Sequence, residues 1–218
     1  IEEAKKRNIL VSNIPTYGEN TVAEHTFALL LDLSRNISKS VKRVKESGFM
    51  ADGFRGFDLK DKTIGVIGLG HIGSHVARIA KGFEMNVLGF DTNQDKKLAK
   101  RLGFKYVSFE DLLKNSDIIT LHVPYNKYTH HLINSANIHL IKKGSYLINT
   151  SRGGIVETSA LVIALDDGTL AGAGLDVLEG ECFIKEEKQI LSRQFLKECD
   201  LKIALQDHLL LKQPNVII

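Results

Sequence analysis

The hydrophobic pattern of this chain changes repeatedly between short apolar runs and longer segments with helical spacing. The short runs predict strands at 63–67, 86–90, 105–107, 117–121, 145–149 and 171–175. The segments between them predict helices at 72–82, 94–102, 109–114, 135–140 and 157–167. Strands and helices that alternate in this way are typical of a parallel sheet with helices on both faces. We therefore predict a doubly wound α/β fold.

The part of the chain before residue 63 has a different pattern. Residues 1–7 resemble the end of a helix, and Ile9-Leu10-Val11 resembles a short strand. Apolar residues then recur near helical spacing and predict one long helix over residues 21–45. Residues 48–61 contain three glycines and mixed polar residues, which predicts a connecting loop.

The last part of the chain also leaves the alternation. Residues 182–213 are charged and rich in Lys, Glu and Leu, which predicts an insertion of short helices. The tail Asn215-Val216-Ile217-Ile218 has the pattern of a strand that enters the core. Chain termini usually lie at the surface, and the first residue is Ile1. We therefore expect a fragment that is cut at both ends.

The most informative local motif follows the first predicted strand of the sheet. It is the glycine run Gly68-Leu69-Gly70-His71-Ile72-Gly73. Gly68 allows a tight turn, Gly70 lets a pyrophosphate approach the backbone, and Gly73 lets the next helix pack closely on the sheet. The N-terminus of that helix offers N–H groups and a positive dipole end to phosphates.

A second signal lies where this motif predicts it. Asp91 ends the next strand, 21 residues after Gly70. A carboxylate at that place accepts hydrogen bonds from the ribose hydroxyls of adenosine and repels a 2′-phosphate. The alternative is a glycine turn without a ligand, which leaves Asp91 unexplained. The sequence therefore predicts that the chain binds NAD rather than NADP.

Other polar or loop-forming residues follow the remaining strands, at the edge where ligands of such sheets bind. They are His122, Pro124, Thr150, Ser151, Arg152 and Asp176. Because several strand ends agree, we expect a binding cleft along this edge. Arg152 stands among small residues, where a guanidinium can hold a carboxylate with two hydrogen bonds and polarise a neighbouring carbonyl.

Composition narrows the class of protein. The chain has 218 residues, 43% of them hydrophobic, which is enough for a substantial core. Its 29 basic and 26 acidic residues are well mixed and give a net charge of +3, which disfavours a nucleic-acid partner. No apolar run reaches the ~18 residues of a membrane span, so we expect no membrane partner. Cys182 and Cys199 lack metal-site spacing, so we expect no metal, and two isolated thiols fit a reducing cytoplasm.

Two motifs together are much more specific than the glycine loop. They are Asn149-Thr150-Ser151-Arg152-Gly153-Gly154 and Gly174-Leu175-Asp176-Val177-Leu178-Glu179-Gly180-Glu181. With Leu121-His122-Val123-Pro124 and Thr21-Val22-Ala23-Glu24-His25, the sequence resembles the D-isomer-specific 2-hydroxyacid dehydrogenases. The resemblance covers the whole chain, more loosely over 182–213. It implies an NAD-dependent oxidoreductase that moves a hydride between C2 of a D-2-hydroxy acid and C4 of nicotinamide.

The resemblance also implies a catalytic set of an Arg, a Glu and a His. Arg152 matches the Arg that binds the substrate carboxylate and polarises the keto oxygen. Glu181, 29 residues further on, matches the Glu that would hydrogen-bond the His and favour its protonated form. We prefer Glu181 to Glu179, whose alternative reading is a solvated acid in a turn. Cys182 stands where family members usually have Pro.

The third member of the catalytic set has no counterpart here. The resemblance places it in a Pro-His dipeptide just after a strand of the type of 215–218, and we assign none of the eight histidines to this role. His122 is expected to line the cofactor cleft, and His25 belongs to the long helix. His130 and His131 are expected to be ordinary residues at a helix start.

The remaining site residues follow from the same resemblance. His71, Ile72, His122, Val123, Pro124, Thr150 and Ser151 are expected to line the cofactor site with the glycines and Asp91. Asp176 matches an Asp near the nicotinamide carboxamide, and its alternative is an acid that caps a turn or helix. Tyr17 matches a Tyr that lines the substrate site, or it is a loop aromatic packed on the long helix. Tyr17, the insertion and the missing Pro together favour the D-lactate branch over the glycerate branches.

These inferences define the expected organisation. Residues 1–18 would be the remnant of a substrate domain, and residues 19–218 an NAD-binding domain of Rossmann type. A homodimer is expected, because in the family the long helix and the loop 48–61 help form a two-fold interface, and Phe49, Phe54 and Phe57 would suit it if exposed. One rival reading is a non-catalytic NAD sensor resembling corepressors, and another is a dimerisation domain.

Overall fold

A computed structural model of the protein describes residues 1–14, 16–49, 52–180 and 201–218. Its centre is a seven-stranded sheet in which every strand pair is parallel, in the order β3-β2-β1-β4-β5-β6-β7. The strands are β1 (Thr63–Ile67), β2 (Asn86–Phe90), β3 (Lys105–Tyr106), β4 (Ile118–Leu121), β5 (Ser145–Asn149), β6 (Leu170–Leu175) and β7 (Val216–Ile217). The predicted parallel α/β sheet is confirmed, including the strand in the tail, which pairs with β6.

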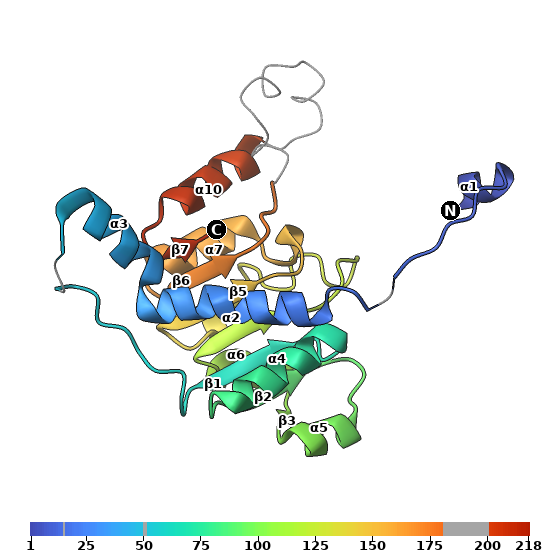
Figure 1. Ribbon diagram of the computed structural model, residues 1–218, viewed down its shortest axis with the longest axis horizontal. Coiled ribbons are helices and arrows are strands. Elements are labelled where there is room, and N and C mark those ends of the chain that lie inside the picture. Colours follow the sequence, from blue (N-terminus) through green and yellow to red (C-terminus); the bar gives the residue numbers. More distant parts are fainter. Residues whose placement is uncertain (15, 50–51, 181–200) are drawn as a thin grey trace.

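Helices cover both faces of the sheet (Figure 1). One layer contains α2 (Glu19–Arg35) and α4 (His71–Gly82), which pack against each other, and α5 (Lys96–Leu102) contacts α4. The other layer contains α6 (Phe109–Asn115), η1 (Ile138–Leu140), α7 (Thr158–Asp166) and α10 (Leu201–Lys212). The remaining elements are α1 (Glu2–Lys6), α3 (Ile37–Ser47) and η2 (Gly153–Ile155).

Alternate residues of each strand point into two separate hydrophobic clusters, as the two-residue period of a strand requires. In β4, Ile118 packs with the α2 and α4 layer, whereas Ile119 packs with the α6 and α7 layer. Ile64, Ile67 and Leu147 are likewise completely buried. Burial on both faces explains why these strands are continuous apolar runs rather than alternating ones.

The single long helix expected over 21–45 is wrong. Asn36 adopts a left-handed conformation with φ of 54° and separates α2 from α3. Asn is among the few side chains that accept this conformation easily. The Asp32 carboxylate accepts hydrogen bonds from the backbone N–H and hydroxyl of Ser38 across the break, which stabilises the new helix start.

Two further expectations need correction. Residues 9–14 form no strand, because among the described residues no strand lies beside them to pair with. Leu10 is 95% exposed. Helix α1 and this segment extend away from the sheet (Figure 1). The helix expected at 135–140 is only the 3₁₀ turn η1. Asn134 and Asn137 form side-chain hydrogen bonds with the local backbone there, and these compete with a regular helix.

The predicted insertion at 182–213 lies partly outside the described residues. Of its described part, residues 201–212 form the one helix α10, which packs against α7 and buries Leu210 in the core. This segment is therefore part of the layer that covers the sheet. Within the described residues, no helix is long and apolar enough to cross a membrane.

Candidate functional site

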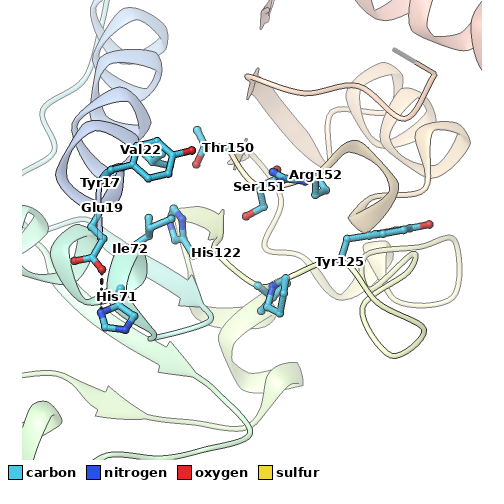
Figure 2. A pocket seen from close by; sticks show the side chains of 13 residues that line it. Tyr17, Glu19, Val22, His71, Ile72, His122, Tyr125, Thr150, Ser151 and Arg152 are labelled. Atoms are coloured by element: carbon cyan, nitrogen blue, oxygen red, sulfur yellow. Dashed lines mark hydrogen bonds and ion pairs between the residues drawn. The ribbon is translucent and has the colours of Figure 1, made fainter. Parts of the chain in front are cut away.

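A pocket of about 770 Å³ lies along the carboxyl ends of β1, β4 and β5. Figure 2 shows that Glu19 and His71 lie at one end of it and Arg152 and Tyr125 at the other. Its lining also contains Tyr17, Gly18, Val22, Ile72, His122, Val123, Pro124, Thr150 and Ser151. Most of the residues predicted for the cofactor site therefore meet in one cavity, together with Arg152.

The glycine loop has the shape that a diphosphate requires. Gly68 has a φ of +90°, and a Cβ at this residue would lie 2.7 Å from the His122 carbonyl oxygen. A Cβ at Gly73 would lie 1.9 Å from the Gly68 carbonyl oxygen, so α4 could not pack where it does. At Gly70, directly before α4, a Cβ would meet nothing within 4 Å, which leaves open space at the N-terminus of that helix. The residues present thus fit the phosphates of a dinucleotide.

Asp91 lies just after β2 and is joined to the glycine loop. Its Oδ2 accepts a hydrogen bond of 2.7 Å from the Leu69 N–H, and its Oδ1 accepts one of 2.9 Å from the Asn93 N–H. A carboxylate has about four acceptor positions, so it can accept ribose hydroxyls as well. The two backbone contacts fix its orientation before any ligand arrives.

His122 is half-buried in the wall of the pocket. Burial lowers its pKa from 6.5 to about 4, because the charged imidazolium cannot be solvated there. Nε2 lies 2.8 Å from the Thr120 hydroxyl, whereas the buried Nδ1 has no hydrogen-bond partner among the described residues. The ring is therefore neutral at physiological pH, a poor state for an acid that must donate a proton.

The segment after β5 brings small polar groups to the pocket and leads to Arg152. The Thr150 hydroxyl lies 3.1 Å from the hydroxyl of Thr26 on α2, which itself donates to the Val22 carbonyl oxygen. Ser151 donates a hydrogen bond of 2.5 Å to the Leu121 carbonyl oxygen. Arg152 is exposed, and one N–H of its guanidinium donates to the Ser151 carbonyl oxygen at 2.6 Å. These bonds fix the backbone from which Arg152 extends.

Two other predicted residues lie at the edges of this region. Asp176, at the end of β6, makes an ion-pair contact of 3.3 Å with Nε2 of His25 on α2. Tyr17 lines the pocket with a side chain that is 86% exposed, so the alternative of an aromatic packed on the long helix is wrong. Within the described residues, no group of three or more His, Cys, Asp or Glu side chains could hold a metal ion.

Glu181, Cys182 and Cys199 lie outside the described residues, whereas Glu179 is described and is not the solvated acid expected. Its side chain is only 11% exposed, and its Oε1 lies 2.5 Å from Nε2 of His131. Its Oε2 accepts hydrogen bonds from the N–H and the hydroxyl of Thr158, the first residue of α7. Glu179 thus stabilises a helix start and holds His131, which stands in a turn and not at a helix start.

Sequence reasoning missed a polar cluster at the other end of the pocket. Glu19 is the first residue of α2, and its carboxylate faces His71 and His75 in the first two turns of α4. Only the pairing of α2 with α4 brings these residues together, because more than 50 positions separate them in the chain. From sequence alone, an acid at the start of a helix is explained by its interaction with the helix dipole, so Glu19 gives no sign of a partner on another helix.

The parallel sheet, the glycine loop at the start of α4 and the acid at the end of β2 define a dinucleotide-binding domain of Rossmann type. The sequence model of the D-isomer specific 2-hydroxyacid dehydrogenase, NAD binding domain, matches residues 27–218. The chain therefore belongs to the D-isomer-specific 2-hydroxyacid dehydrogenase family.

Individual relatives agree with this assignment. The chain is 44% identical over 182 residues to a 2-hydroxyacid dehydrogenase homolog of Zymomonas mobilis. This match covers 83% of the chain and 55% of that protein. It is 43% identical over 194 residues to the glyoxylate reductase of Thermococcus litoralis, covering 86% of the chain and 59% of the relative. The fold is similar to the crystal structure of D-lactate dehydrogenase from Aquifex aeolicus with NAD and lactic acid, with a TM-score of 0.83 and 43% sequence identity. The superposition covers 100% of the chain and 63% of that structure. The chain thus spans less than two thirds of these relatives.

Proposed function

We propose that this chain is the cofactor-binding part of an NAD-dependent oxidoreductase that acts on D-2-hydroxy acids of the lactate and pyruvate type. The observation that carries the proposal is a single pocket that is lined both by His71 and Ile72 of the glycine motif and by Arg152. A cofactor whose phosphates lie at the start of α4, near His71, would extend its nicotinamide toward Arg152, at the opposite end of the pocket (Figure 2). The structural similarity to an enzyme with NAD and lactic acid supports this substrate class, whereas the similarity to a glyoxylate reductase leaves a shorter keto acid as the rival.

In this proposal the chain binds NAD through the residues described above. Gly68, Gly70, His71, Ile72 and Gly73 would hold the pyrophosphate, and Asp91 the adenosine ribose. The walls of the cleft would be formed by His122, Val123, Pro124, Thr150 and Ser151, and Asp176 would contact the carboxamide of the nicotinamide. When bound, the cofactor supplies or accepts the hydride. The chain itself contributes binding, orientation and charge.

Arg152 would act on the substrate. Its planar guanidinium can bind the carboxylate of a 2-keto acid with two hydrogen bonds and polarise the adjacent carbonyl. Tyr17 would line the same substrate site. We propose Glu181 as the partner of the acid-base His that the family resemblance implies.

We also propose a homodimer and a domain boundary near residue 18. Ile37, Val41 and Val44 form an exposed apolar stripe on α3, and Phe49 beyond it is 90% exposed. Phe57, by contrast, is partly buried against Tyr146, so it stabilises the domain itself. The exposure of residues 9–14 agrees with a segment that belongs to a different domain.

The first test is cofactor binding and its discrimination, measured by titration of NADH fluorescence. We expect the protein to bind NADH more tightly than NADPH. Asp91→Ala should weaken NADH binding about tenfold or more, since hydrogen bonds to charged groups contribute roughly 1.5–3 kcal/mol. NADPH binding should change less, because the variant also removes repulsion of the 2′-phosphate.

Asp58→Ala is the matched control, because this acid is exposed and contacts Arg35 at a surface remote from the glycine loop. It should change neither affinity. A protein that does not bind NADH would contradict the proposed function. An unchanged preference in Asp91→Ala would show that Asp91 does not contact the ribose.

A further inference from the structure

The pocket contains an acidic side chain at the end where the cofactor's phosphates are proposed to bind. Glu19 lines this pocket, and its side chain is only 19% exposed. Its Oε1 is buried and lies 3.1 Å from Nδ1 of His71, at ion-pair distance but without the geometry of a hydrogen bond (Figure 2). His71 is the first residue of α4, directly after Gly70.

A carboxylate at this place is unexpected in a diphosphate site. A pyrophosphate is an anion, and two like charges in a partly desolvated pocket repel each other more strongly than they would in water. Glu19 therefore opposes the ligand unless a positive charge compensates it. The structure offers two candidates for that charge, the Arg78 guanidinium and the His71 imidazole.

Arg78 compensates Glu19 only through an intermediate side chain. Its Nη2 lies 2.9 Å from Nδ1 of His75, and because a guanidinium can only donate, this nitrogen accepts. His75 is therefore neutral and carries its proton on Nε2, which lies 3.7 Å from Oε2 of Glu19. Arg78 also donates to Asn20 at 3.2 Å, so its position is fixed on both sides.

His71 differs from His75 in that its ring is mostly exposed and can gain a proton. It contacts Glu19 on one side, and a diphosphate at the start of α4 would approach it on the other. An imidazole between two anions favours its protonated form. The other ionisable side chains around the pair are His75 and Arg78 on α4, Asp91 at the glycine loop, and Tyr17 and His122 on the pocket wall.

We propose that Glu19 couples cofactor binding to protonation: His71 takes up a proton from solvent when the pyrophosphate binds, and Glu19 opposes binding when that proton is missing. The step forms one N–H bond at the unprotonated ring nitrogen of His71, and solvent supplies the proton. This inference rests on the proposed NAD site. Glu19 is thereby a residue that sets the pH dependence of cofactor affinity.

The test is isothermal titration of NADH into the purified protein at pH 7.5, in phosphate and in Tris. The difference in heat between the two buffers reports the protons exchanged on binding. We expect uptake of about half a proton or more per NADH, and an affinity that falls as pH rises from 7 to 9, with a limit of about tenfold per pH unit for one proton.

Two variants at the pair and one control complete the test. Glu19→Gln should lower proton uptake, because His71 keeps the pyrophosphate but loses its carboxylate partner, and it should bind NADH about 3- to 10-fold more tightly at pH 8.5, because one repulsive charge is gone. His71→Asn should abolish uptake while keeping the repulsion, so its affinity should be weak at every pH. Glu46→Gln on α3 removes the same charge far from the pocket and should behave as the unchanged protein (Figure 1).

The outcomes separate this inference from the function on which it rests. Binding of NADH without proton uptake, or uptake in Glu19→Gln equal to that of the unchanged protein, would overturn the role of Glu19 and leave the NAD site intact. No binding of NADH at any pH would contradict the proposed function itself.

Discussion

The role proposed for Arg152 depends on its position in the fold. This residue follows the buried strand β5, and the backbone around it is fixed by hydrogen bonds of Asn149 and Ser151. Arg152 is exposed and lies at the end of the pocket opposite His71. It is therefore free to meet a substrate without taking part in the binding of phosphates.

This separation leads to a prediction for a polypeptide that carries the whole catalytic set. Arg152→Gln should lower kcat/KM for a 2-keto acid by about 100-fold or more, since a lost charge-assisted pair costs roughly 3 kcal/mol. NADH affinity should change by less than about twofold. Steady-state kinetics and NADH titration measure the two effects, with Arg55→Gln in the exposed loop as control. A large loss of NADH binding would refute the assigned role.

At the scale of elements, the contact between β1 and α4 determines whether the phosphate loop exists. Gly68 and Gly73 lie close together where the strand turns into the helix, and neither has room for a side chain. The helix start, and with it the N–H groups that would bind phosphate, is positioned by this contact.

Two substitutions within α4 test the point. Gly73→Ala should destabilise the protein by about 1–3 kcal/mol, because the new methyl group overlaps the Gly68 carbonyl oxygen. It should also weaken NADH binding. Gly82→Ala, at the end of the same helix, meets no atom within 4 Å and should be neutral or stabilising by up to about 1 kcal/mol. Urea unfolding checks both, and equal effects of the two variants would contradict the packing argument.

The elements also show what the hydrophobic pattern can predict. Strands β1, β2 and β5 and helix α4 lie within one residue of their expected bounds, because glycines or polar residues end each apolar run. The break at Asn36 could not be predicted in this way, since the apolar spacing continues across it. A left-handed Asn depends on local hydrogen bonds that periodicity does not report.

At the scale of the whole molecule, two hydrophobic clusters on opposite faces of one sheet make the fold a cooperative unit. His122 lines the pocket just after β4, half-buried, and its desolvated ring is neutral. In the unfolded chain its imidazole would titrate near its ordinary pKa of 6.5, whereas in the folded protein it titrates at about 4. Unfolding at low pH therefore binds a proton.

The consequence is a defined pH dependence of stability. Well above pH 6.5 the ring is neutral in both states. Between pH 6.5 and about 4 the ring is protonated in the unfolded chain but stays neutral in the folded protein, so protonation favours unfolding. The free energy of unfolding should decrease by about 2 kcal/mol between pH 6.5 and 5 from this residue alone. Urea unfolding of His122→Asn should show a smaller decrease over this window than the unchanged protein. His139→Gln, at an exposed position, should not alter the decrease in unfolding free energy. If His122→Asn showed the same pH dependence as the unchanged protein, His122 would not be its source.

The sequence by itself determined the parallel α/β class, the position of the phosphate loop and the carboxylate after β2. Those features depend on short-range patterns, namely an apolar strand, its turn residues and a fixed spacing to Asp91. Only the tertiary structure decided which side chains meet across elements. Glu19 and His71 come from two helices, and Glu179 and His131 from two loops, so no local pattern could pair them. The burial of His122, and with it the charge state of that ring, likewise follows from packing rather than from sequence.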